Sequence, residues 1–189
     1  MDFAHDEVDV AVRVCFSGRP TDLAAHFLLR IHCTPMCSPE FREAHGGLAD
    51  PSDLLAATQL SAQDDWWERW FDLVGISLID RAQREQRLRG LRLDGQVFDG
   101  SAALAHQGVA MLSPALWRAD LAAGRLVQLF PQLLVEPYGY WLVYPEHKRN
   151  VPKLKTFREW LLKEMALHAE KGPAEVFVEP VDISPSALA

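Results

Sequence analysis

The sequence lacks a hydrophobic run long enough to cross a membrane, and it opens without a secretion signal. A membrane-spanning helix needs about 20 consecutive apolar residues, whereas the longest candidate, 126–135, is interrupted by Gln128, Pro131 and Gln132. The first residues, MDFAHDE, form neither a basic start nor an apolar signal core. The three cysteines are an odd number, which argues against a disulfide framework. The sequence therefore predicts a cytoplasmic protein with reduced thiols and no contact with a membrane.

Positive charge is also scarce, since 19 Lys and Arg residues stand against 26 Asp and Glu residues and give a formal net charge of -7. A nucleic-acid binder needs a basic surface to neutralise phosphates, so we expect no direct nucleic-acid binding by this chain. Arginines do gather at positions 81, 84, 87, 89 and 92. They allow a basic patch, but the intervening Asp80 and Glu85 and the absence of interleaved aromatics favour a solvated surface.

The common catalytic motifs are missing as well: the sequence has no Gly-x-Ser-x-Gly elbow, Walker loop, Gly-x-Gly-x-x-Gly turn or His-Glu-x-x-His pair. His32, Cys33 and Cys37 lie close together and, with His26 or His45, allow a zinc site. The cysteines fall within or at the end of a predicted strand and have no paired second half-site, which favours buried structural thiols. We predict no catalytic residue, no metal ligand and no cofactor.

Apolar and turn-forming residues alternate along the chain in a way that predicts an α/β fold. With 189 residues, we expect one compact unit or two small lobes. Short apolar runs predict strands at 9–14, 27–36, 88–93, 109–112, 125–130 and 140–144. Capping residues and helical spacing predict helices that start near residues 38, 50, 64, 94, 113 and 151. The alternation favours largely parallel sheets, and the polar, proline-containing end of the chain, 169–189, predicts a loose tail.

Two local patterns allow a functional and a purely structural interpretation. Trp67, Trp70, Phe71 and Val74 follow helical spacing, which is typical of a core face, although an aromatic stripe can also line a ligand pocket. The turn at 94–97 leads from a predicted strand into a predicted helix, with Asp94 as the expected cap. There Gly95 leaves the N–H groups of the helix start accessible to a small anion. On these residues alone, a capped helix and an anion site both stay open.

Several segments, taken in order, resemble the effector-binding domain of LysR-type transcription regulators, especially the branch with the activators of glycine cleavage and of β-lactamase expression. Trp67, Trp70 and Gly75 resemble the tryptophan helix of the family. The other matching segments are DVAVR at 9–13, TPMCSP at 34–39, LADPSDL at 48–54, AALAHQGVAML at 102–112, DLAAGRLV at 120–127, YWLVYP at 140–145 and FREWL at 157–161. Each motif is weak alone, but their order and spacing over residues 8–167 make the combination specific.

The resemblance implies a type II periplasmic-binding-protein-like fold with two α/β lobes, crossing strands near 27–36 and 140–144, and a small molecule bound between the lobes. Lobe one would comprise 1–36 and 140–168, and lobe two 37–139. The family pocket carries over to Ser17 and Gly18, to Gly95 and Gln96, and to Tyr140. Because the turn at Gly95 coincides with this pocket, the resemblance favours the anion site over a merely capped helix.

The chain also departs from the family pattern. Met1 falls after the family's helix-turn-helix, its linker helix and the first strand and helix of lobe one, so we expect lobe one to be incomplete at the N-terminus, with exposed apolar surface. Residues 98–101, FDGS, differ from the family's Leu-Ala-Leu-Gln pattern. We therefore predict a non-enzymatic sensor of a small-molecule effector, such as a carboxylate or an amino acid, in a truncated LysR-type regulator. The alternatives are a module that forms homodimers or mixed dimers with full-length regulators, and a solute-binding protein of the same fold.

Overall fold

The computed structural model describes residues 3, 8–16, 19–62, 65–77 and 92–180, and the chain divides into two compact units. Unit 1 comprises Met1–Ile31 and Val135–Ala189, and unit 2 comprises His32–Leu134. The long strand β2 (Ala24–Cys37) contributes residues to both units, as does β5 (Leu134–Tyr144). Among the described residues, no helix is both long enough and apolar enough to cross a membrane.

Unit 1 is built on a sheet in which β5 lies between β1 (Ala11–Cys15) and β2. β1 and β5 are antiparallel, with Ala11 opposite Val143 and Cys15 opposite Gly139. Gly139 permits a close approach between β5 and β2, because a Cβ atom at this position would lie 2.4 Å from the carbonyl oxygen of Leu29. A small apolar cluster around Trp141 and Val143 forms one part of the core of this unit.

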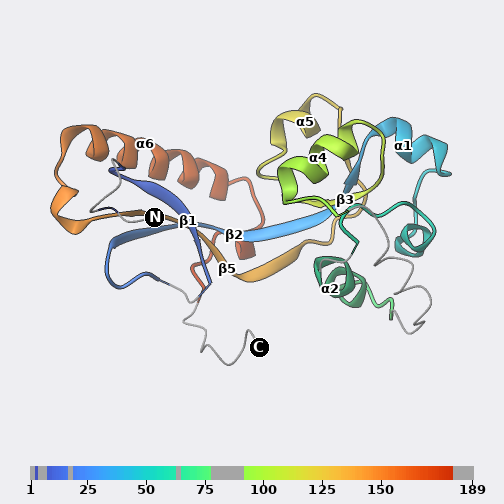
Figure 1. Cartoon of the computed structure of the whole chain (residues 1–189), viewed down its shortest axis with the longest axis horizontal. Helices are drawn as coiled ribbons and strands as arrows, with labels where there is room; N and C mark the ends of the chain where they lie inside the picture. The colour runs from blue at the N-terminus through green and yellow to red at the C-terminus, as the bar shows by residue number, and fades with distance from the viewer. Residues whose placement is uncertain (1–2, 4–7, 17–18, 63–64, 78–91, 181–189) are drawn as a thin grey trace. The chain divides into compact units, whose positions relative to one another are not determined.

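The helix α6 (Pro152–Ala169) packs on the sheet of unit 1, as Figure 1 shows. It begins with Pro152 at its first position, where the missing N–H would have no helical partner. Leu154 is its one fully buried residue among those described. Within the segment expected as a loose tail, η3 (Ala174–Val176) is a short 3-10 helix whose Val176 is buried. Residues 181–189 of that tail lie outside the described residues.

Unit 2 has a small antiparallel sheet in which β2 pairs with both β3 (Ala110–Leu112) and β4 (Val127–Gln128). Because side chains alternate along a strand, β2 and β3 bury residues on both faces. One face joins Cys33, Cys37 and Met111 to the aromatic residues of α2 (Asp65–Leu73). The other joins Met36, Ala110 and Leu112 to Ala103 of α4 (Gln96–Leu104). The remaining elements of unit 2 are α1 (Pro39–Ala44), η1 (Pro51–Leu55) and α5 (Arg118–Ala122).

Several local predictions are confirmed. Ser38 caps α1 by accepting a hydrogen bond from the N–H of Phe41 at 3.2 Å, and Pro39 opens that helix. Trp67, Trp70 and Phe71 are at most 1% exposed, so the aromatic stripe of α2 is a core face.

The expectation of largely parallel sheets is wrong for three described strand pairs, since β1 with β5, β2 with β3 and β2 with β4 are antiparallel. Outside the named strands, Gln59 and Val109 form an isolated parallel bridge. The antiparallel pairing joins segments that are far apart in the chain, so local alternation of apolar runs does not determine its direction. The predicted strand at 88–93 lies outside the described residues up to 91, and Arg92 and Leu93 are not in a strand.

Candidate functional site

The candidate site is the N-terminus of α4 in unit 2, where Gly95 is the capping residue. Its backbone has φ 94° and ψ 166°, a conformation that is essentially restricted to glycine. The carbonyl oxygen of Gly95 accepts from the N–H groups of Phe98 at 3.0 Å and of Asp99 at 3.2 Å. The prediction that Asp94 caps this helix is wrong, because the helix starts one residue later and no side chain caps it.

The N–H groups of Gln96 and Val97 are left free at this helix start. No residue in the described part of the chain accepts a hydrogen bond from either of them. Such groups point outward along the helix axis and carry the positive end of the helix dipole. Since Gly95 has no side chain to cover them, they can donate to a small anion.

The side chain of Gln96 joins the helix start to the segment after β3. Its Oε1 atom accepts from the backbone N–H of Ser113 at 2.9 Å, and Ser113 is buried. A backbone N–H can only donate, so this bond fixes the orientation of the amide group. The Nε2 group of Gln96 has no partner among the described residues and adds a third donor beside the two backbone N–H groups.

A buried network holds the segment that leads into α4. The hydroxyl of Ser61 donates to Oδ1 of Asp99 at 2.6 Å and accepts from the N–H of Leu93 at 3.1 Å. Ser61 and Asp99 are 3% and 6% exposed, so the hydrogen bond between them is shielded from water. Sequence reasoning missed both residues. The one available signal was that Asp99 shares a helix face with the apolar Ala103, where a buried carboxylate needs a donor.

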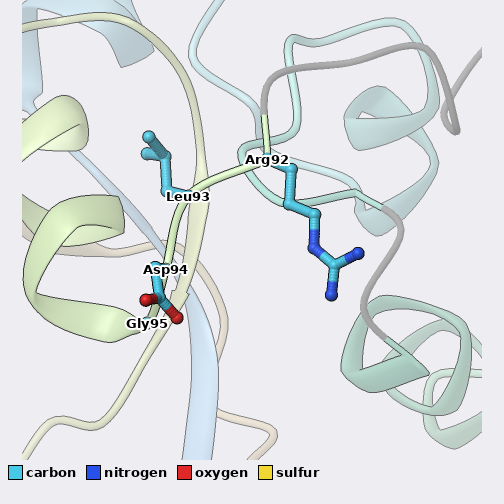
Figure 2. A pocket seen from close by; sticks show the side chains of 4 residues that line it. All are labelled: Arg92, Leu93, Asp94 and Gly95. Carbon is cyan, nitrogen blue, oxygen red and sulfur yellow. The ribbon is translucent and has the colours of Figure 1, made fainter.

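Beside the helix start, an open hollow of about 430 Å³ is lined by Arg92, Leu93, Asp94 and Gly95. Figure 2 shows that the side chains of Arg92 and Asp94 extend in different directions from this segment. Both side chains are exposed. The hollow is therefore lined by one positive and one negative side chain, and it lies next to the start of α4 at Gly95. These are the groups that would recognise a carboxylate or a zwitterion.

The structure brings two of the predicted ligand-binding residues together, since Gly95 and Gln96 are neighbours at the start of α4. Tyr140 lies in unit 1, on β5 opposite Val14 of β1, and is half-buried. Burial raises the pKa of the Tyr140 phenol, so it remains a neutral hydrogen-bonding group. Ser17 and Gly18 lie outside the described residues.

Cys33 and Cys37 are buried, as predicted. They are not part of a disulfide, have no exposed surface, and belong to the aromatic core of unit 2. Burial raises the pKa of Cys37 to about 11, which keeps the thiol protonated at neutral pH. Within the described ranges, no group of three or more His, Cys, Asp or Glu side chains is arranged to hold a metal ion.

Comparison with known proteins places this fold in one family. Residues 2–166 match the model of the LysR substrate binding domain. The chain is 32% identical over 171 residues to the transcriptional activator AmpR of Citrobacter koseri, and the match covers 86% of the chain and 53% of that protein. It is 30% identical over 174 residues to the glycine cleavage system transcriptional activator of Escherichia coli, and the match covers 88% of the chain and 52% of the activator.

Solved structures agree with this assignment. The effector domain of AmpR from Pseudomonas aeruginosa superposes with a TM-score of 0.71 at 27% identity, over 90% of this chain and 78% of that one. The AmpR effector-binding domain of Citrobacter freundii, at 24% identity and a TM-score of 0.70, supports the fold alone; it covers 88% of this chain and 78% of its own. These matches confirm the expected α/β fold of the periplasmic-binding-protein type.

The chain spans about half the length of the curated relatives it matches. Those relatives are transcriptional activators, and the solved relatives are effector domains of the regulator AmpR. The resemblance noted from the order of short motifs is therefore confirmed over nearly the whole chain. This protein belongs to the LysR substrate-binding domain family, the effector-binding part of LysR-type transcription regulators.

Proposed function

We propose that this chain is a non-enzymatic, cytoplasmic sensor that binds a small carboxylate, such as an amino acid, at the start of α4. The observation that carries the proposal is the set of unpartnered donors of Gln96 and Val97 beside the hollow that Arg92 lines. A carboxylate placed there accepts from the helix N-terminus and pairs with the guanidinium of Arg92. The carboxylate of Asp94, in the same hollow, can pair with the ammonium group of an amino acid.

Three further residues enter the proposal from the family resemblance. They are Ser17, Gly18 and Tyr140, which the resemblance assigns to the ligand pocket of the family. The effector shifts the regulator between conformations only as far as it binds one of them more tightly. We also propose that the chain associates with a second copy of itself or with a LysR-type regulator. Light scattering of the purified chain would test the first, and co-purification with a regulator would test the second.

The test is calorimetric titration of the chain with a panel of amino acids and monocarboxylates at neutral pH. We expect at least one of them to bind, and Arg92→Gln to weaken that binding about tenfold or more, as expected for the loss of a charge-assisted hydrogen bond. Asp94→Asn should weaken the binding only of ligands that carry an ammonium group.

The matched control is Arg69→Gln, which removes the same charge from unit 2. Arg69 lies on α2, where it pairs with Asp65 at 3.8 Å across an exposed surface. Such a surface pair contributes little to stability, so the control should bind as wild type does. A panel in which nothing binds, or equal affinity in wild type and Arg92→Gln, would reject the assignment of this site.

A further inference from the structure

Unit 1 contains a hydrogen-bonded cluster that the proposed effector site does not use. Tyr144, the last residue of β5, is fully buried. Its hydroxyl lies 2.9 Å from Nη1 of Arg158 on α6 and 2.9 Å from Nε2 of His26 on β2. The rings of His26 and Tyr144 stack with centroids 5.7 Å apart, and the guanidinium of Arg158 lies 5.7 Å from the Tyr144 centroid. One hydroxyl thus connects three elements.

The hydrogen bonds around the Tyr144 hydroxyl favour a neutral His26. The guanidinium of Arg158 can only donate, so the Tyr144 oxygen accepts from it. The single proton of the hydroxyl is then available for His26, and Nε2 accepts it when the ring carries its own proton on Nδ1. In this neutral tautomer every donor of the cluster has an acceptor. A proton on Nε2 would leave the hydroxyl proton of Tyr144 without this acceptor, and protonation of both ring nitrogens would place a second cation beside Arg158.

The charged groups that act on His26 oppose its protonation. They are Arg158 on α6, Arg149 before α6, Arg19 before β2, and Glu146 in η2 (Glu146–Lys148). Burial, followed by the three arginines, lowers the pKa of His26, and Glu146 acts in the opposite direction. Glu146 is itself paired with Arg149 at 3.0 Å, so the surroundings remain positive.

We propose that His26, Tyr144 and Arg158 form a pH-responsive latch that ties α6 to β5 and β2 within unit 1. The latch is closed while His26 is neutral and is weakened when His26 is protonated. The pKa of His26 is lower in the folded state than its ordinary value of 6.5. The neutral ring therefore makes its full contribution to the stability of the folded state at pH values above 6.5. This contribution is lost as the pH falls from 6.5 through the pKa of the folded protein. Docking of α6 should therefore loosen under acidification, whether or not an effector binds.

Hydrogen exchange of the whole chain at pH 7.5 and pH 5.0 tests the latch. We expect the protection factors of α6 amides in the wild type to fall about threefold or more at the lower pH. In His26→Gln, whose neutral amide can still accept from Tyr144, this dependence on pH should be mostly removed. The matched control is His147→Gln, because His147 lies on the exposed surface of η2. That variant should behave as the wild type does.

A second measurement needs no variant. The nitrogen chemical shifts of the His26 ring should report a neutral ring with the proton on Nδ1 at pH 7.5, and an apparent pKa below 6.5. The opposite tautomer, or a protonated ring at pH 7.5, would overturn the latch. So would an undiminished dependence on pH in His26→Gln.

Discussion

Substitution of Gly95 by alanine tests the backbone geometry on which the candidate site depends. At φ 94° and ψ 166°, a residue with a Cβ atom is strained by about 1–3 kcal/mol. A Cβ atom placed there meets no other atom within 4 Å, so packing adds nothing to this cost. Alanine also restricts the unfolded chain, which offsets about 0.4–1 kcal/mol. We therefore expect Gly95→Ala to lower the free energy of unfolding by about 1–2 kcal/mol.

Urea unfolding followed by tryptophan fluorescence measures this loss, because Trp67 and Trp70 are buried in the core of the same unit. Gly124→Ala is the matched control. Gly124 also has open space around its Cβ position, but its φ of 68° lies in the left-handed region that other residues reach at about 1–2 kcal/mol. Gly95→Ala should destabilise the protein more than the control does and should weaken carboxylate binding. If it is as stable as the wild type, the helix does not start as described.

Three further perturbations probe other parts of the fold. Gly139→Ala places a Cβ atom 2.4 Å from the Leu29 carbonyl oxygen, so urea denaturation should show a free energy of unfolding lower by about 1–3 kcal/mol. An unchanged denaturation midpoint would mean that β5 and β2 lie further apart. Cys37, with its pKa raised to about 11, should resist a thiol reagent at pH 8 while the half-buried Cys15 reacts first; rapid labelling of both would contradict the described burial. Ser61→Ala removes a donor to Asp99 and an acceptor for Leu93, so the same assay should show a free energy of unfolding lower by about 1–3 kcal/mol. A smaller decrease would indicate that the network is solvated.

The features that sequence predicted correctly are local ones. The start of α1 depends on Ser38 and Pro39, which are adjacent in the chain, and the core face of α2 depends on apolar spacing within one helix. Gly95 could be singled out for a similar reason, since a glycine between a strand-like run and a helical run is visible without tertiary contacts. The family could also be predicted from the sequence, because the order and spacing of several short motifs are specific even though each motif alone is weak.

The features that sequence missed depend on residues far apart in the chain. β1 and β5 pair in antiparallel fashion across more than a hundred residues, and no local periodicity encodes the partner or the direction. Helix α5 begins after Trp117, not at Ser113, although Ser113 is a suitable cap. The backbone N–H of Ser113 is bonded to Gln96 and its carbonyl oxygen accepts from Trp117, so the segment between them forms turns before the helix begins. Tertiary hydrogen bonds outweighed the local capping preference.

The same long-range bonds determine how the candidate site can work. Gln96 anchors the start of α4 to Ser113, and Ser61 anchors both Leu93, before the helix, and Asp99, within it. The free N–H groups of Gln96 and Val97 are therefore held in place by buried contacts before any ligand arrives. A preorganised site loses little conformational entropy on binding. Since the donors do not need to be assembled by the ligand, the affinity of this turn should depend mainly on charge, which makes the guanidinium of Arg92 and the carboxylate of Asp94 the groups that select the effector.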